Sequence, residues 1–155
     1  MRPRRSSASS RSCTSALVIR TSLLGRALDG GSSLVDWLLR QRAPVRGYCR
    51  AVFSGLPVNE VAVVVDRILR RPVPLVGVHH LSAAPIAKYE VLELVRRAWQ
   101  LDHVTIVPDD SVVIDRSLDS RRLRQAIGYE PLPWPELIAR MHGFYEALDT
   151  GTQVA

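Results

Sequence analysis

Two hydrophobic periods alternate along the body of this chain, and this alternation restricts its fold more than any other feature. Short apolar runs typical of buried strands occur at 17–19, 75–81 and 104–107, with a further extended stretch at 45–53. Apolar residues recur at helical spacing over 34–39, 61–69, 86–99, 123–127 and 137–148. Strands that alternate with helices predict an α/β fold with some parallel strand pairs.

Capping residues indicate where several of these helices begin and end. Ser33 and Asp36 resemble a capping box, because a serine oxygen can accept a free amide and an acid favours the positive helix end. Asp119 is expected to cap a helix that ends at Gly128. Pro135 suits the first position of the final helix.

The helical stripes predict which side chains are buried. The stripe over 61–69 places Val61, Val64, Val65, Ile68 and Leu69 on one face, although a valine run also favours strands. The final helix has a clear stripe, which consists of Leu137, Ile138, Met141, Phe144, Tyr145 and Leu148.

Length and charge limit the function classes. A chain of 155 residues with 46% hydrophobic content suits one globular domain, and no apolar run approaches the roughly 20 residues of a membrane span. The net charge is +6, but four arginines lie in the acid-free stretch 1–15. Removing these four from the 21 basic residues leaves 17 against 15 acidic ones. A phosphate-tracking stripe is therefore not predicted, and no nucleic-acid or membrane partner is expected.

Residues 1–15 are rich in Arg and Ser and are expected to be a disordered or misread head, so the predicted domain covers 16–150. Asp29–Gly31 is expected to form a turn. Cys13 and Cys49 are far apart and belong to no Cys/His cluster, which predicts neither a disulfide nor zinc and favours a cytoplasmic location.

Two pairs of metal-ligand types are better explained by structure than by metal binding. His79 and His80 are adjacent on an expected strand, so their side chains point to opposite faces. Asp109 and Asp110 lie in a Pro-Asp-Asp-Ser sequence that is typical of a turn. No metal site is predicted.

Three segments in order resemble the dTDP-4-dehydrorhamnose reductase branch of the extended short-chain dehydrogenases/reductases. They are Val18–Gly25 with its Arg-Thr-Ser, Phe53–Ala62, and Gly77–Ser82 followed by Lys88-Tyr89-Glu90. Two later segments, 118–123 and 128–137, resemble the end of the same family, so that the resemblance covers about four fifths of the chain.

The resemblance implies a partial NAD(P)-binding Rossmann-like fold, namely its C-terminal strands and a small helical substrate-binding part. It also implies a nucleotide-sugar ligand, either a dTDP- or a UDP-sugar. The substrate-binding residues that it implies are Arg20, Thr21, Ser22, Phe53, Ser54, Gly55 and Arg116. Arg20 has independent support, because it follows a strand at its carboxyl end, where open α/β sheets place ligand crevices.

The chain departs from the family pattern at two other positions. Leu23 replaces the aromatic residue expected after Arg-Thr-Ser, and Val112 replaces an arginine expected to face phosphate. Arg116 can substitute for that arginine, since a guanidinium offers paired donors to a diphosphate. It can equally pair with Asp115 or Asp119 at the surface, and the sequence leaves both interpretations open.

The resemblance implies NAD(P), but the motifs that handle it are not found. Gly25, Gly30 and Gly31 do not form G-x-x-G-x-x-G, and no tyrosine has a lysine four residues later. No catalytic residue is therefore assigned. The favoured hypothesis is a sugar-nucleotide-binding segment of a reductase or epimerase, truncated at its front and inactive alone. The alternative is a noncatalytic interaction or regulatory module with the same fold.

The absent half has a consequence for stability. The strands over 17–21 and 75–81 look buried on both faces, and the strands expected beside them belong to that half. The sequence therefore predicts open sheet edges, marginal stability, self-association and no NAD(P)H turnover by the chain alone.

Overall fold

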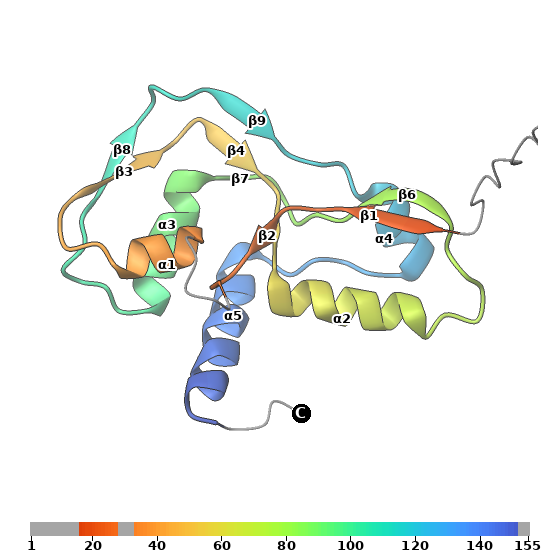
Figure 1. Cartoon of the computed structure of the whole chain (residues 1–155). Helices are drawn as coiled ribbons and strands as arrows, with labels where there is room; N and C mark the ends of the chain where they lie inside the picture. Colours follow the sequence, from red (N-terminus) through yellow and green to blue (C-terminus); the bar gives the residue numbers. More distant parts are fainter. Residues whose placement is uncertain (1–15, 28–32, 152–155) are drawn as a thin grey trace, which may run out of the picture.

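Helices and strands alternate through residues 16–27 and 33–151, which are the residues that the computed structural model describes (Figure 1). The strands are β1 Leu17–Arg20, β2 Leu23–Leu24, β3 Val45–Tyr48, β4 Ala51–Phe53, β5 Leu56–Pro57, β6 Gly77–His80, β7 Ile86–Ala87, β8 Ile106–Asp109 and β9 Ile114–Arg116. The helices are α1 Leu34–Leu39, α2 Val58–Leu69, α3 Lys88–Ala98, α4 Arg121–Ile127 and α5 Trp134–Asp149. The expected α/β fold is confirmed.

Most strand pairs are parallel, as the alternation predicts. β1 pairs with β6, β2 with β5, β3 with β8, and β4 with β9, all in parallel. Only β7 runs antiparallel to its partner β4 within the described part. Parallel partners bring distant segments together, because each pair joins strands at least 33 residues apart in sequence, as in Leu23 beside Leu56.

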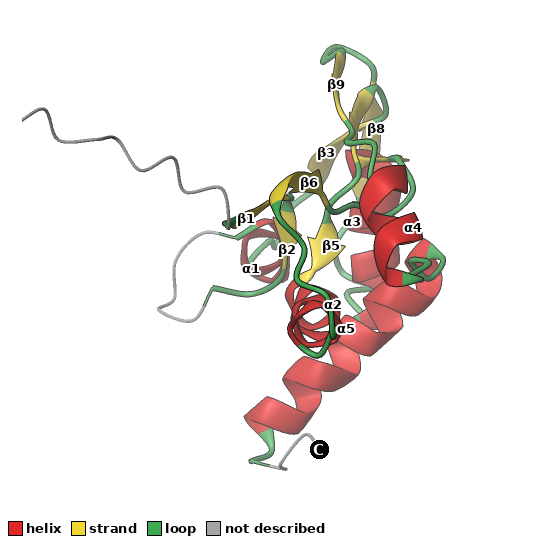
Figure 2. Cartoon of the chain, turned by 90° about the vertical axis from the view of Figure 1, so that its right-hand side faces the viewer, coloured by secondary structure: helices red, strands yellow, loops and turns green. Residues whose placement is uncertain are grey.

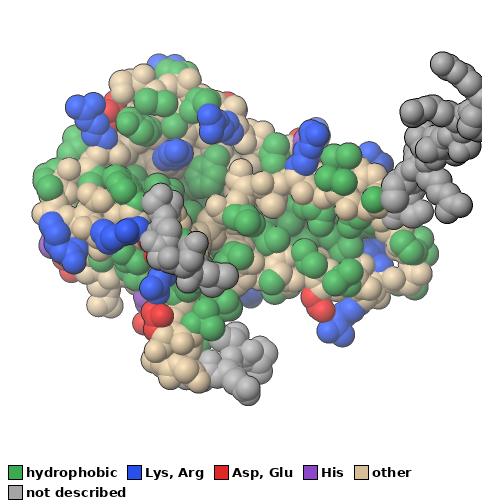
Figure 3. Space-filling model, viewed as in Figure 1, with side chains coloured by type: hydrophobic (Ala, Val, Ile, Leu, Met, Phe, Trp, Pro, Cys, Tyr) green, Lys and Arg blue, Asp and Glu red, His purple; other side chains and the backbone are tan. Residues whose placement is uncertain are grey.

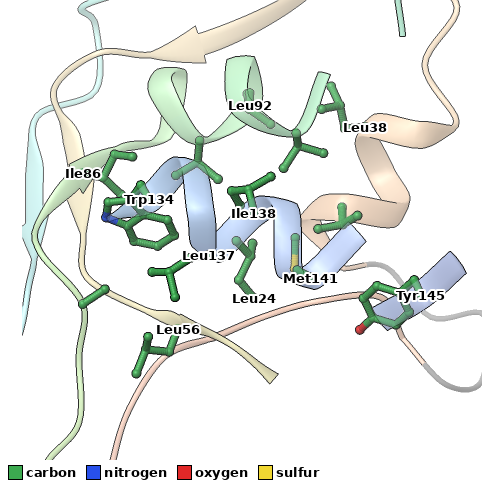
Figure 4. Close-up of a cluster of buried hydrophobic side chains, with 14 of the residues drawn as sticks. Leu24, Leu38, Leu56, Ile86, Leu92, Trp134, Leu137, Ile138, Met141 and Tyr145 are labelled. Atoms are coloured by element: carbon green, nitrogen blue, oxygen red, sulfur yellow. The ribbon is translucent and has the colours of Figure 1, made fainter. Parts of the chain in front are cut away.

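The core forms around α5, whose apolar stripe was predicted. Leu137, Ile138 and Met141 are fully buried, and Figure 4 shows them among side chains of α1, α3, β2 and β5. Leu148 at the end of the stripe is exposed, because the last turns of α5 extend beyond the other elements (Figure 2). Trp134, which the stripe analysis missed, is buried at the start of the helix.

The predicted caps at Ser33 and Gly128 are confirmed, whereas Asp119 is not the N-cap of α4 and α5 begins at Trp134, one residue before Pro135. The Ser33 hydroxyl accepts the Asp36 amide at 2.9 Å at the start of α1. Gly128 ends α4 with φ of +60°, which is a left-handed conformation that glycine adopts without steric cost. Ser120 occupies the cap position of α4, yet Asp119 Oδ1 still accepts the Arg121 amide at 3.0 Å.

Several expectations about helix faces and boundaries were wrong. Val65 and Leu69 of α2 are exposed, because the helix is covered only on the side of Val64 and Ile68. The fourth strand begins at Ile106 rather than at residue 104, since pairing with β3 starts at Val45 opposite Ile106. Ile86 belongs to β7 and precedes the helix it was expected to start.

The β1–β6 pair is open on one face, so the expectation that both faces are buried was also wrong. Val18 and Val78 lie opposite each other in the register and are each 48% exposed, whereas α4 packs against β6 on the other side (Figure 2). We use the term open face for the exposed residues Val18, Leu23, Val63 and Val78. Figure 3 shows hydrophobic side chains gathered over β1, β2 and α2 in this region.

Two expected features, the head 1–15 and the turn Asp29–Gly31, lie outside the described residues. Of the five helices that are described, none has the length and apolarity needed to span a bilayer.

Candidate ligand site at the strand ends

The segments of the predicted site converge where four strands end. Arg20, the last residue of β1, lies opposite His80 of β6, and its carbonyl accepts the Leu81 amide at 2.9 Å. Phe53, the last residue of β4, lies opposite Arg116 of β9. Carboxyl ends of parallel strands are the usual ligand position in open α/β sheets.

A close approach at Gly55 joins these two groups of strand ends. The Ser22 carbonyl accepts the Leu56 amide at 2.9 Å. A Cβ atom at position 55 would lie 2.7 Å from the Ser22 carbonyl oxygen and 3.0 Å from the Phe53 ring. Glycine is therefore required here to let the end of β1 approach the end of β4.

Buried serines hold the loops that follow these strands. The Ser54 hydroxyl accepts the Leu118 amide at 2.8 Å, and Ser82 Oγ lies 2.8 Å from the Leu118 carbonyl oxygen and 2.9 Å from Ser120 Oγ. All three serines are less than 5% exposed. Ser54 thus positions the loop after β9, and it offers little surface to a ligand. Sequence analysis missed Ser82 and Ser120, which come together only through the fold.

Phe53 and Arg116 line one cavity of about 190 Å³. Its other lining residues are Tyr48, Ala51, Val52, Lys88, Val112 and Ile114. The centroid of the Phe53 ring lies 5.8 Å from that of the Trp134 ring. The Trp134 indole donates a hydrogen bond to the Ala84 carbonyl at 2.7 Å. We call this hollow the Arg116 cavity.

Arg20, Thr21 and Ser22 lie outside the lining of the Arg116 cavity. Arg20 is exposed at the end of β1, and the Thr21 hydroxyl donates to the Ser22 carbonyl at 3.4 Å. The structure therefore divides the predicted site into one group at the β1 end and another at the β4–β9 end, joined through Ser22 and Gly55.

A second cavity, also of about 190 Å³, adjoins the first. Its lining residues are Leu34, Trp37, Arg46, Tyr48, Lys88 and Leu92, so Tyr48 and Lys88 belong to both cavities. We call it the Trp37 cavity and use the term cavity end for β3, β4, β8, β9 and Lys88. Figure 3 shows several Lys and Arg side chains over this part of the molecule.

Arg116 does not make the surface ion pairs that the sequence left open. The Ser117 amide occupies Asp115 Oδ1 at 2.8 Å and lowers the pKa of that carboxyl. Hydrogen bonds from Arg121 lower the pKa of Asp119 to about 2, and the closest of these is 2.6 Å. Among the described residues, Arg116 and Lys88 make no ion pair and no side-chain hydrogen bond.

The described part offers no glycine cradle of the kind that holds a dinucleotide phosphate. A Cβ at Gly25 or Gly47 would lie 2.6 Å and 2.7 Å from a tyrosine side chain, so both positions are filled by packing. Gly128 and Gly143 lie at the end of α4 and within α5. These residues do not fit the NAD(P) phosphates.

Metal binding has no support in the described ranges either. They contain no group of three His, Cys, Asp or Glu residues close enough to hold an ion. His79 is buried, with Nε2 3.1 Å from the Val76 carbonyl oxygen, whereas His80 is partly exposed, as expected for neighbours on a strand. The Asx turn is also confirmed, since Asp109 Oδ1 accepts the Ser111 amide at 2.8 Å.

Solved structures similar to this chain include dTDP-4-dehydrorhamnose reductases, a dTDP-glucose 4,6-dehydratase and UDP-sugar 4-epimerases. The dTDP-4-dehydrorhamnose reductase of Bacillus anthracis, solved with NADP, is 18% identical with a TM-score of 0.69, over 84% of this chain and 48% of that one. The Clostridium acetobutylicum reductase is 15% identical with a TM-score of 0.68, over 84% and 49%. The UDP-glucose 4-epimerase of Thermotoga maritima, solved with UDP-glucose, is 16% identical with a TM-score of 0.61, over 85% and 46%.

These similarities establish the fold and its extent. The chain spans about half the length of the structures it matches. A scan against protein-family models finds no match, and a search of curated proteins finds none. The chain has the Rossmann-like fold of about half of an extended short-chain dehydrogenase/reductase.

Proposed function

We propose that this chain binds a nucleotide sugar, as the substrate-binding segment of an NAD(P)-dependent reductase or epimerase that resembles dTDP-4-dehydrorhamnose reductase. The observation that carries this proposal is the shared cavity of Phe53 and Arg116 at the carboxyl ends of β4 and β9. The unpaired guanidinium of Arg116 suits the diphosphate, and the Phe53 ring offers an apolar wall to the rest of the ligand. The UDP-glucose in the T. maritima epimerase structure supports this class of ligand.

The proposal assigns binding, and no catalysis, to the chain alone. No tyrosine in the sequence is followed by a lysine four residues later, so no proton-donating pair of that spacing is present. The isolated chain is therefore proposed to oxidise no NAD(P)H. It is also proposed to act in the cytoplasm. An NADPH oxidation assay with dTDP-4-keto sugars tests the first part, and turnover that depends on the chain contradicts it.

Titration calorimetry of the full chain with UDP-glucose and dTDP-glucose tests the binding proposal. We expect measurable affinity, and we expect Arg116→Gln to weaken it about tenfold or more, because it removes charged hydrogen bonds to phosphate. Arg122→Gln is the matched control, since Arg122 is exposed on α4 and lines neither cavity. Absence of heat with any nucleotide sugar contradicts the proposal.

The open face favours a second candidate function, a noncatalytic interaction module that binds another protein chain. Val18, Leu23 and Val78 are exposed, and β1 has no strand partner other than β6 among the described residues. Apolar side chains beside a free strand edge promote association, so the isolated chain is proposed to self-associate. Light scattering after size-exclusion chromatography tests this, and a stable monomer at all concentrations contradicts it.

The DNA upstream of the reading frame separates the two candidates. An intact G-x-x-G-x-x-G in another frame supports the reductase or epimerase, whereas sequence unrelated to a Rossmann unit supports the interaction module.

A further inference from the structure

The two cavities are each too small for a nucleotide, and their linings share two residues. Each has a volume of about 190 Å³, below the roughly 300 Å³ at which pockets for drug-sized ligands begin. Tyr48 and Lys88 line both. A nucleotide that occupies both cavities must pass Tyr48 and Lys88, the residues that the two linings share.

The charges around this path favour an anion. Lys88 and Arg116 have no ion-pair partner in the described part of the chain, and Arg46 reaches Asp109 only at 3.4 Å with its own side chain 76% exposed. No acidic residue lines either cavity. Val112, which replaces the expected arginine, contributes an aliphatic wall to the Arg116 cavity. The second cation in the lining of this cavity is Lys88 of α3.

Lys88 occupies a position that local preference does not explain. It is the first residue of α3, where the positive end of the helix disfavours a cation. The chain contains 21 basic residues in total, and its one lysine stands here. A residue that opposes its local environment without a compensating contact is typical of a functional site.

The Trp37 cavity offers aromatic side chains to the base of a nucleotide, apart from Arg116. Trp37 lines one cavity together with Leu34 and Leu92, whereas Arg116 lines the other. Indole and phenol faces stack on flat heterocycles of any base.

We infer that Lys88 and Arg116 together hold the diphosphate of a nucleoside diphosphate sugar, whose base enters the Trp37 cavity beside Tyr48. This inference rests on the proposed function and assigns a phosphate contact to Lys88, outside the predicted site. The sugar then extends from the Arg116 cavity, past Phe53 at the strand end. Lys88 is thus a determinant of specificity for diphosphates over uncharged nucleosides.

Calorimetric titration of the full 155-residue chain with uridine, UDP and UDP-glucose tests this assignment. Lys88→Gln is expected to weaken UDP and UDP-glucose about tenfold and to leave uridine unchanged, because only the former two carry phosphate. Lys88→Arg should restore most of the affinity. Trp37→Ala should weaken uridine and UDP by a similar factor. Arg122→Gln serves as the control of equal charge change, and thermal unfolding of every variant checks that the fold is kept.

The outcomes separate this inference from the proposed function. If the parent chain binds no nucleotide, both fail. If the parent chain binds UDP-glucose and Lys88→Gln binds it equally well, the inference fails and the proposed function stands. An equal loss for uridine and UDP in Lys88→Gln indicates a packing role and overturns the phosphate contact. If uridine binds too weakly to measure, unchanged UDP affinity in Lys88→Gln overturns the inference and a tenfold loss supports it.

Discussion

The cavity end and the open face expose different kinds of side chain. At the cavity end, unpaired cations and aromatic residues surround two hollows. On the open face, valines and a leucine flank a strand pair with no further partner among the described residues. Cations around a cavity suit a small anion, whereas apolar side chains beside free backbone groups suit another polypeptide.

The two regions also differ in how the fold holds them. The loops at the cavity end are fixed from within, by the buried serines Ser54, Ser82 and Ser120. The β1–β6 pair is covered on one side, where α4 packs against β6 and Leu17 and Ile19 contact the core. Ligand binding and self-association should therefore respond to different substitutions.

The largest expected effect comes from the shared core, on which both regions depend. Leu137→Ala should lower the free energy of unfolding by about 2–5 kcal/mol, because it leaves a cavity at a fully buried position. Leu69→Ala is the control, since Leu69 is 77% exposed, and we expect a change within about 0.5 kcal/mol. Urea denaturation measures both, and equal effects would contradict the assignment of the core.

The close approach of the β1 end to the β4 end is tested at Gly55. Gly55→Ala should cost about 1–3 kcal/mol of stability, because the added Cβ meets the Ser22 backbone at 2.7 Å. Separation of the β1 end from the β4 end should also weaken UDP-glucose binding. Gly143→Ala is the control in α5, where a Cβ meets no atom within 4 Å. Wild-type stability in Gly55→Ala would show that the approach is not tight.

Local signals in the sequence predicted much of the fold. The stripe of α5, the Ser33 cap and the left-handed Gly128 follow from side-chain spacing and short-range hydrogen bonds, and the structure contains all three. The burial of Val65 and Leu69 was predicted wrongly, because periodicity marks an apolar face but does not say whether another element covers it. The position of β8 depended on its pairing with β3, which the local sequence does not encode.

The candidate site was predictable only in part, for the same reason. Arg116 and Phe53 were named from the resemblance, and the structure brings them to one cavity. Lys88 belongs to the Lys-Tyr-Glu segment of the resemblance, which implies no role for it at the site. Its place beside Tyr48 and Arg116 arises from the packing of α3 on β3 and β4, which are more than 34 residues away in sequence.

The independence of the two regions is tested on the open face. The double substitution Val18→Lys with Val78→Lys places charges beside the free strand edge and should convert self-associated chain to monomer. UDP-glucose affinity should stay within about twofold, since neither residue lines a cavity. Light scattering over a concentration series and calorimetry measure the two effects. Loss of ligand affinity on dissociation would contradict the separation, because it would place the site at an interface between copies.

The smallest expected effect concerns the acid next to the cavity end. The pKa of Asp119 is lowered to about 2 by hydrogen bonds from Arg121, so its charge stabilises the folded chain above the ordinary carboxyl pKa of roughly 4. This stabilisation should disappear as the pH falls from about 4 to about 2, where the folded chain also takes up the proton. Asp119→Asn should therefore be slightly less stable than the parent chain at neutral pH and equal to it near pH 2. Asp110→Asn, which removes a carboxylate without an ion pair or side-chain hydrogen bond in the described structure, should show no such pH-dependent difference. Asp119→Asn should also leave the affinity for UDP unchanged, because Asp119 forms its ion pair with Arg121 and not with Arg116. An increase in that affinity would show that Asp119 neutralises Arg116 in solution, and the contrast between an unpaired cation at the cavity end and the paired charges around it would then not hold.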